Sequence, residues 1–240
     1  MRLLENFSNN SIYSVQSEIN NGFITIKGGH RIGIAGTCII ENGIVKNIKN
    51  ISSLNVRIAR EVKGCSSFIM DYILNDNTFS NTIIISPPGC GKTTMLRDMI
   101  RCLSDGYKNF QGKNIGVIDE RSEIAAMYKG VPQNDVGKRT DVMNNCLKHI
   151  GISMLVRSMG PQVIATDEIG GERDEEAIYN AMYSGVKFLF TAHGEKIEDV
   201  SKNFINDKVF SNIIILKNSN KPGSVKNIYR LKEEKYVACY

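Results

Sequence analysis

The chain has 240 residues and an ordinary apolar content of 42%, which is enough for one α/β core plus a small accessory domain. Its net charge of +5 is uneven, because residues 1–64 carry eight Lys/Arg and four Asp/Glu while the remainder carries 22 against 21. This asymmetry suits attraction to nucleic acid or anionic lipid, and equally a solvated basic face, since no block of consecutive basic residues appears.

No apolar run approaches the roughly 18 residues of a membrane span. Polar residues also interrupt the N-terminus before a signal-peptide core could form; they are Glu5, Asn6, Ser8, Asn9 and Asn10. The six cysteines show no C-x-x-C pair and no metal-ligand spacing, so reduced thiols are expected instead of disulfides or a metal centre. We therefore expect a cytoplasmic protein.

Residues 22–60 have the pattern of short strands, with apolar runs at Phe23–Ile26 and Arg31–Ala35 separated by glycines. Asn42-Gly43 between two apolar runs predicts a hairpin turn. A helix is expected to begin near Ser66 or Ser67. We therefore expect residues 1–64 to form a small, mainly β domain, and residues 65–240 to form a parallel α/β domain.

The apolar run Thr82–Ile85 leads directly into Ser86–Thr94, which reads Ser-Pro-Pro-Gly-Cys-Gly-Lys-Thr-Thr. This stretch predicts a phosphate-binding loop, here called the predicted phosphate loop, although glycine would stand at Ser86 in the strict pattern G-x-x-x-x-G-K-[ST]. Its backbone N–H groups, a lysine and the next hydroxyl would bind the phosphates and Mg²⁺. The expected nucleotide-binding residues are Pro88, Gly89, Cys90, Gly91, Lys92, Thr93 and Thr94. A helix should follow and stop at Gly106.

Four apolar runs end in polar chemistry. Besides the predicted phosphate loop, they lead into Asp119-Glu120-Arg121, Asp167-Glu168 and Ala192-His193-Gly194. Ligands of open parallel sheets bind beyond the carboxyl ends of the strands, so these four ends can converge on one nucleotide.

Asp167-Glu168 has the chemistry of the second half of a nucleotide hydrolysis site. Asp167 would hold Mg²⁺, directly or through water, and Glu168 would orient the attacking water. The alternative, a capping pair, explains these residues poorly, because Gly170-Gly171 separates them from the helix expected over Glu172–Met182.

Asp119-Glu120 allows two interpretations: Glu120 could act on the nucleotide water or on Mg²⁺, or the pair could cap a helix expected over Ser122–Met127. His193 could donate a hydrogen bond to the γ-phosphate. The polar span Ala125–Asn145 is long for a connection within a domain, and we expect it to be disordered in the free protein.

Phosphoryl transfer also needs positive charge near the γ-phosphate, and an arginine from a neighbouring subunit can supply it. Arg57 and Arg60, at the end of the β unit, are the candidates for this catalytic role, although surface strand residues would look the same in the sequence.

The ordered motifs resemble those of the secretion-ATPase superfamily, which drives type II and type IV secretion and pilus machines, and of its branch that acts in sporulation. The resemblance rests on Gly28–Arg31, Ile51–Glu61, Ser86–Thr94, Asp119–Ile124, Gly137–Val142 and Arg157–Gln162. It implies a RecA-like P-loop NTPase core and a cytoplasmic, Mg²⁺-dependent ATPase that assembles as a hexamer. It also implies channel components at the membrane as partners, between mother cell and forespore. The family usually has a longer N-terminal region, so the first domain is expected to be truncated.

Two other functions stay open. One is a nucleic-acid-stimulated RecA-like ATPase, although no nucleic-acid-binding signature is visible and nucleic acid is not an expected partner. The other is a nucleotide-controlled scaffold that binds ATP with little turnover. The choice between adenine and guanine nucleotides is not readable from the residues.

Overall fold

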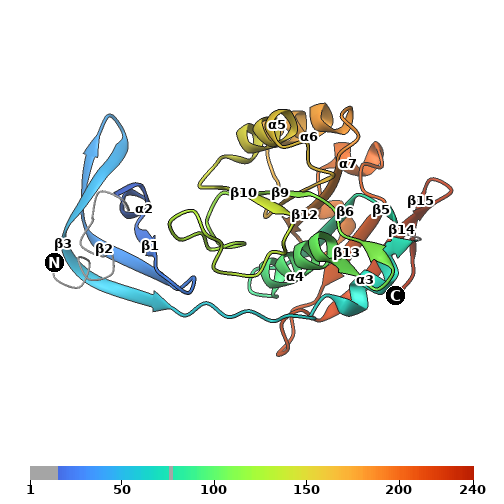
Figure 1. Cartoon of the computed structure of the whole chain (residues 1–240), viewed down its shortest axis with the longest axis horizontal. Helices are drawn as coiled ribbons and strands as arrows, with labels where there is room; N and C mark the ends of the chain where they lie inside the picture. Colours follow the sequence, from blue (N-terminus) through green and yellow to red (C-terminus); the bar gives the residue numbers. More distant parts are fainter. Residues whose placement is uncertain (1–15, 76–77) are drawn as a thin grey trace. The chain divides into compact units, whose positions relative to one another are not determined.

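The protein was analysed as a computed structural model that describes residues 16–75 and 78–240. The chain divides into two compact units, residues 1–61 with 126–134 and residues 62–125 with 135–240 (Figure 1). Residues 1–15, which include the polar residues expected to interrupt a signal peptide, lie outside the described residues. In the described part of the chain, no helix is long and apolar enough to cross a membrane.

In its described residues, the first unit contains a three-stranded antiparallel sheet and one short helix. Its elements are α2 (Gln16–Asn20), β1 (Phe23–Thr25), β2 (Arg31–Glu41) and β3 (Ile44–Arg57), and the strand order is β1-β2-β3. The expected hairpin turn is confirmed, because Asn42 and Gly43 both have left-handed backbone angles, φ 51° and 76°. The core is small and consists of Ile19, Ile24, Ile32 and Ile34.

The second unit is built on an eight-stranded sheet. Its strands are β6 (Thr82–Ser86), β9 (Ile115–Asp119), β10 (Thr140–Asn144), β11 (Val163–Thr166), β12 (Lys187–His193), β13 (Asn212–Leu216), β14 (Val225–Lys232) and β15 (Lys235–Ala238). The order is β10-β9-β11-β12-β6-β13-β14-β15. The first six strands are parallel, and the last two are added antiparallel. The expected parallel α/β architecture is confirmed.

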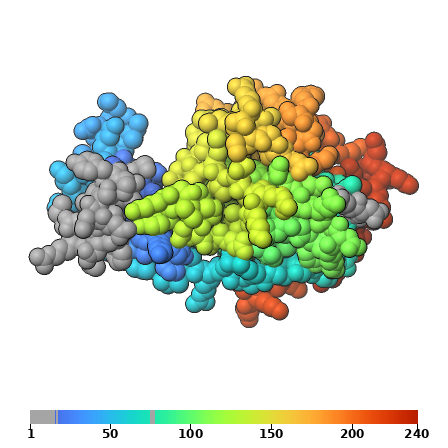
Figure 2. Space-filling view, viewed as in Figure 1, coloured from blue at the N-terminus to red at the C-terminus, as the bar shows by residue number. Residues whose placement is uncertain are grey.

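Helices cover both faces of this sheet. They are α3 (Ser67–Ile73), α4 (Lys92–Asp105), α5 (Lys148–Ser158), α6 (Glu172–Met182), a 3₁₀ turn η2 (Ile197–Asp199) and α7 (Lys202–Asn206). The predicted helices at Ser67, after the predicted phosphate loop and over Glu172–Met182 are confirmed, and α4 ends before Gly106 as expected. Helices α5 and α6 lie on one side of the sheet and α4 on the other (Figure 1). Helices α5 and α6 adjoin at the surface of the unit (Figure 2, yellow and orange).

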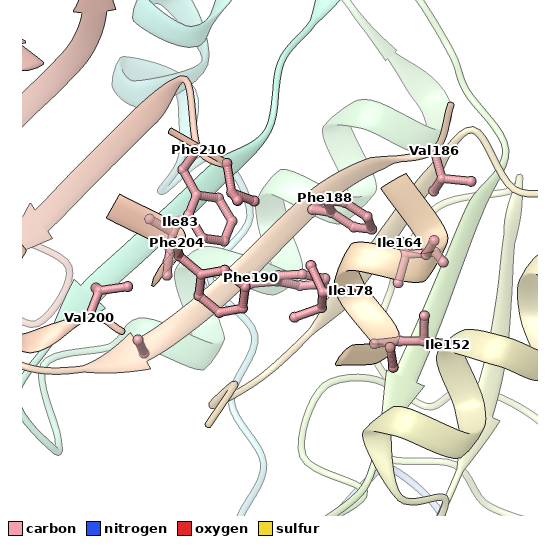
Figure 3. Packing of buried hydrophobic residues seen from close by; sticks show 14 of the residues in the cluster. Ile83, Ile152, Ile164, Ile178, Val186, Phe188, Phe190, Val200, Phe204 and Phe210 are labelled. Carbon is pink, nitrogen blue, oxygen red and sulfur yellow. The ribbon is translucent and has the colours of Figure 1, made fainter. Parts of the chain in front are cut away.

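The core beneath α5, α6 and α7 is rich in aromatic side chains. Phe188 and Phe190 of β12 stack with ring centroids 5.1 Å apart, and Phe204 of α7 meets Phe210 edge-on at 5.6 Å (Figure 3). Successive residues of a strand face opposite sides of the sheet, so the intervening Leu189 faces the side of α4. The central strands are therefore buried on both faces. This packing holds their carboxyl ends, which carry the site residues, in place.

Two expectations about the segment after β9 are wrong. The helix predicted over Ser122–Met127 does not form, because the Asp119 carboxylate and the side chain of Arg97 take up its backbone groups, as described below. The disorder predicted for Ala125–Asn145 is contradicted at its C-terminal end, where β10 pairs in parallel with β9. Within the first unit, Tyr128 and Val131 form an antiparallel bridge.

A buried carboxylate fixes the start of the second unit to α4. Asp98 accepts hydrogen bonds from Gly64 N (3.0 Å), Ser66 N (2.8 Å) and Ser66 Oγ (2.7 Å), and it is paired with Arg101 at 2.7 Å. Burial alone would raise the pKa of Asp98, but the hydrogen bonds from Ser66 and Arg101 lower it below its usual value of 3.8. The chain just after the first unit is thereby tied to the helix that follows the predicted phosphate loop.

We expect Asp98→Asn to lower the free energy of unfolding by about 3 kcal/mol at pH 7, because an amide can neither accept all these bonds nor pair with Arg101. The lowered pKa stabilises the wild type above pH 3.8, and this stabilisation is lost as the pH falls through the folded-state pKa. Denaturant unfolding should show that the difference in free energy of unfolding between the wild type and Asp98→Asn is smaller at pH 3 than at pH 7. The exposed Asp71→Asn is the control and should change little. A difference in free energy of unfolding that is larger at pH 3 than at pH 7 would contradict a stabilising role of the ionised Asp98 carboxylate.

Candidate functional site

The four polar strand ends lie next to one another. Strands β9, β11, β12 and β6 are consecutive in the sheet and all parallel, so their carboxyl ends share one edge. The sequence alone could not give this order. The expected convergence of the four strand ends is therefore confirmed, and it results from the strand order.

The predicted phosphate loop connects β6 to α4 with left-handed backbone at both glycines. Gly89 has φ 76° and Gly91 has φ 86°. A Cβ on Gly89 would meet nothing within 4 Å, whereas one on Gly91 would lie 2.9 Å from the backbone of Gly223. Gly89 is thus needed for its left-handed backbone and not for lack of space, whereas Gly91 also allows a close approach by another segment.

A buried lysine and a glutamate form the centre of the site. Lys92, the first residue of α4, is only 6% exposed, and its Nζ lies 3.6 Å from Glu168 Oε1 and 3.3 Å from His193 Nδ1. His193 Nε2 lies 2.9 Å from Glu168 Oε1, and Arg121 Nη1 lies 3.2 Å from Glu168 Oε2. Three side chains, from two other strand ends and one helix start, thus meet at the carboxylate of Glu168.

Glu168 is held in this position at a cost in backbone strain. Its φ of 51° lies in the left-handed region, which is unfavourable for a residue with a side chain. Its N–H donates to Thr191 Oγ1 at 2.8 Å, which fixes the turn after β11 against β12. Burial alone would raise the pKa of Glu168, but the nearby Lys92, His193 and Arg121 lower it below its usual value of 4.5. The carboxylate is therefore ionised at neutral pH.

The neighbouring Asp167 links two hydroxyls. Thr93 Oγ1 donates to Asp167 Oδ2 at 2.6 Å, and Thr191 Oγ1 donates to Asp167 Oδ1. A threonine hydroxyl at a helix start beside a strand-end carboxylate forms a set of hard oxygen donors, which suits Mg²⁺ that also binds phosphates and water.

A small cavity lies between the two acidic strand ends. It has a volume of about 20 Å³ and is lined by Asp119, Glu120, Arg121, Glu123, Lys148, Asp167 and Glu168. That is room for about one water molecule. Glu120 is paired with Lys148 at the start of α5, whereas Glu168 is shared among three basic side chains. The two glutamates thus face the same water-sized space with different partners.

Glu168 also lines a larger cavity of about 380 Å³. Its lining includes His193, the glycines at 170 and 171, and the carboxylates of Glu175 and Asp199. Glu168 thus lines two cavities of very different size.

Asp119 has a structural role that the sequence did not show. Its carboxylate accepts hydrogen bonds from the N–H groups of Glu123, Ile124 and Ala125 at 2.8–3.0 Å. From the opposite side, Arg97 of α4 donates to the carbonyls of Glu123 and Ile124, both at 2.6 Å. The backbone is therefore held between two side chains in a non-helical path. Both Asp119 and Glu120 line the small cavity, but the Asp119 carboxylate is taken up by these backbone N–H groups.

The structure brings together most of the predicted site residues. Lys92, Thr93, Asp167, Glu168 and His193 form one cluster through the contacts above, and Glu120 shares a cavity with Glu168. The other predicted residues of the loop, Pro88, Gly89, Cys90, Gly91 and Thr94, lie between β6 and α4 or in its first turn. Arg57 and Arg60 belong to the first unit, so their part in the site stays a prediction.

Two contributors were not among the predicted site residues. Arg121 follows the Asp119-Glu120 pair directly, and its position right after this strand end was the one signal for it in the sequence. Lys148 starts a helix almost 30 residues after the acidic pair that it meets, and nothing in the local sequence announces this contact.

The residues of this edge fit a Mg²⁺-bound nucleoside triphosphate. The Lys92 ammonium is buried beside the acidic strand end at Glu168, and the Thr93 hydroxyl and the Asp167 carboxylate lie together. Among the described residues there is no cluster of three or more His, Cys, Asp or Glu that could hold a metal by itself. Thr93 and Asp167 could supply two oxygen ligands to Mg²⁺, to which phosphate oxygens and water would be added.

Comparison with known sequences identifies relatives over most of the chain. A family described as "Sporulation stage III, protein AA" matches residues 2–236. Stage III sporulation protein AA of Bacillus subtilis is 42% identical over 232 residues, which cover 95% of this chain and 75% of that protein. The protein SEEDLING PLASTID DEVELOPMENT 1 of Arabidopsis thaliana is 32% identical over 162 residues. The match covers 66% of this chain but only 22% of the plant protein.

Comparison with solved structures supports the fold. The ATPase DotB of Legionella pneumophila superimposes with a TM-score of 0.57 at 13% identity, covering 97% of this chain and 68% of DotB. The pilus retraction motor PilT, solved with bound ADP, gives a TM-score of 0.53 at 15% identity, covering 83% of this chain and 58% of PilT. The second unit is thus a RecA-like P-loop NTPase core, as expected from the sequence.

Proposed function

This chain belongs to the family of sporulation stage III, protein AA, and from this premise we propose that it is an oligomeric, Mg²⁺-dependent ATPase that energises a channel complex during sporulation. The observation that carries the proposal is the meeting of Lys92, Glu168 and His193 beside the Thr93–Asp167 pair at the end of the predicted phosphate loop. The working location is the cytoplasm, at the membrane through channel proteins that link mother cell and forespore.

In the proposed reaction, Lys92 exchanges its contacts with Glu168 and His193 for the β- and γ-phosphates of ATP. Thr93 and Asp167 would hold the metal, and Mg²⁺ would neutralise the charge that develops on the phosphate oxygens. Once Lys92 leaves it, the Glu168 carboxylate can accept a hydrogen bond from a water in the small cavity and orient that water toward the γ-phosphate. His193 then loses its contact with Lys92 and can donate to the γ-phosphate.

Each site would be finished by a neighbouring subunit. The reason is chemical: the positive charges beside Glu168 come from Lys92 and Arg121, and they already offset its negative charge in the nucleotide-free protein. A triphosphate brings further negative charge, which an arginine from the first unit of another copy could meet. The ring size expected from the family resemblance is six.

The proposal is tested by measuring ATP binding and hydrolysis by the purified chain with and without Mg²⁺. Lys92→Ala should weaken ATP binding and abolish hydrolysis, because it removes the buried ammonium that would meet the phosphates. The matched control is Lys187→Ala, at the opposite, amino end of the strand that carries His193. Equal ATP affinity in the wild type and Lys92→Ala would overturn the proposal.

Further measurements separate the alternatives. ATP bound tightly by an assembled protein that shows no turnover would favour a nucleotide-controlled scaffold. Hydrolysis that rises on addition of single-stranded DNA, with DNA binding that weakens steeply with salt, would favour the nucleic-acid-stimulated ATPase.

A further inference from the structure

The connection between β13 and β14, residues 217–224, packs against the predicted phosphate loop. Gly223 N donates to the carbonyl of Cys90 at 2.7 Å. A Cβ on Gly91 would lie 2.9 Å from Gly223 N and 3.3 Å from the Pro222 Cβ. The two segments therefore meet backbone to backbone, and this is why Gly91 is needed at its position.

The connection has a defined shape of its own. Lys217 N donates to Ser224 O at 2.9 Å, and the Ser224 hydroxyl donates to Lys221 O at 2.6 Å. The Ser219 hydroxyl also donates to Lys221 O, at 2.8 Å. These bonds fix the backbone around Lys221 and Pro222, whose side chains are exposed. An exposed tip held by serine hydroxyls can present its side chains to a ligand with little loss of conformational entropy.

The sheet order gives the predicted phosphate loop two different sides. β12 and β11, on one side of β6, carry His193 and Glu168 at their ends, whereas β13, on the other side, leads into the 217–224 connection. A nucleoside triphosphate is an extended molecule with the γ-phosphate at one end and the base and ribose at the other. If the γ-phosphate faces Glu168, the nucleoside must leave the loop on the side away from the catalytic strands.

We propose that the 217–224 connection forms the wall against which the base and ribose of the bound nucleotide lie, with Pro222 and Lys221 as the contacting residues. This rests on the proposed function, because it assumes that the γ-phosphate faces Glu168. The Pro222 ring offers an apolar surface to the flat face of a base. The Lys221 ammonium offers hydrogen-bond donors to ribose hydroxyls and to acceptor atoms at the edge of the base. Contacts with the connection would thus add to the affinity for ATP that the phosphate contacts already provide.

The test compares ATP with inorganic triphosphate, each with Mg²⁺, by calorimetric titration of the full chain. In the wild type, ATP should bind more tightly than triphosphate. The double variant Lys221→Ala/Pro222→Ala should lose about tenfold in ATP affinity, since a lost contact of about 1.4 kcal/mol corresponds to that factor. Its affinity for triphosphate should stay unchanged. Lys235→Ala, in the neighbouring β14–β15 hairpin, is the control and should change neither affinity.

The possible results separate this inference from the proposed function. If the wild type binds ATP tightly and the double variant binds it equally well, the 217–224 connection does not contact the base and ribose. The ATPase proposal is unaffected by that result. Equal losses for ATP and triphosphate also overturn the inference, because they mean that the connection only supports the predicted phosphate loop. A wild type that binds neither ligand overturns both proposals.

Discussion

Replacing Glu168 by glutamine is expected to lower ATP hydrolysis about 10²–10⁴-fold and to leave ATP binding intact. The amide keeps the size of the side chain but carries no negative charge to polarise a water. The effect should be large at neutral pH because the pKa of Glu168 is held below 4.5 by Lys92, His193 and Arg121, so the wild-type group is ionised there. The measurement is steady-state phosphate release, with ATP affinity determined in parallel.

The controls for this prediction lie close by. Glu176→Gln removes an exposed carboxylate from α6 and should leave the rate unchanged. Glu120→Gln should lower the rate less than Glu168→Gln, since Glu120 is already neutralised by Lys148. If Glu168→Gln turned over within about threefold of the wild type while Glu120→Gln did not, the roles of the two glutamates would be exchanged.

The second large effect is expected from the two arginines of the first unit. Replacing Arg57 and Arg60 together by alanine should lower hydrolysis about 10³–10⁵-fold, the range found where an arginine from another subunit stabilises the transition state. Both side chains are exposed, so the fold of the first unit should not depend on them. The matched control removes two other positive charges from β3, Lys46 and Lys49.

Mixing two inactive proteins tests whether these arginines act on a neighbour. Glu168→Gln subunits retain Arg57 and Arg60, and the arginine variant retains Glu168. If the site is shared, a mixed assembly contains complete sites and regains part of the activity. Activity that stays absent in the mixture, while each variant assembles normally, would place the arginines in their own subunit or outside the reaction.

Local patterns predicted the parts of the site well. The apolar runs ending at Ser86, Asp119 and Thr166 are strands, because hydrophobic runs of this length bounded by polar residues suit buried parallel strands. The helix over Glu172–Met182 matches its predicted bounds. What the sequence could not supply is the order β9-β11-β12-β6, since strand pairing depends on contacts between residues far apart in the chain.

Most errors arose where tertiary contacts override local preference. The segment after Asp119 has helical periodicity, but its N–H groups bind the buried carboxylate and its carbonyls bind Arg97. The strand β10 is partly exposed and polar at the edge of the sheet, so it carries no apolar signal. In both cases the structure of the segment depends on residues outside it: Asp119 and Arg97 for the segment after β9, and strand β9 for β10.

Helix α5 shows that helical spacing of apolar residues does not by itself predict which face of a helix is buried. The apolar residues along and next to this helix have helical spacing, but most of them are not buried. Leu147, Ile150 and Met154 are 45–50% exposed, whereas Ile152 and Leu155 pack on the sheet. Spacing alone could not tell which face meets the core, because both faces carry apolar residues.

The most direct test of a shared hydrolysis site is the rate of ATP hydrolysis per protomer across a range of protein concentrations. Sedimentation on the same samples would give the assembled fraction, and Glu168→Gln would serve as the inactive reference. The account predicts a rate that rises in proportion to the assembled fraction in the wild type and stays near background in the variant. A wild-type rate that is constant while the protein passes from monomer to oligomer, or a variant as active as the wild type, would contradict it.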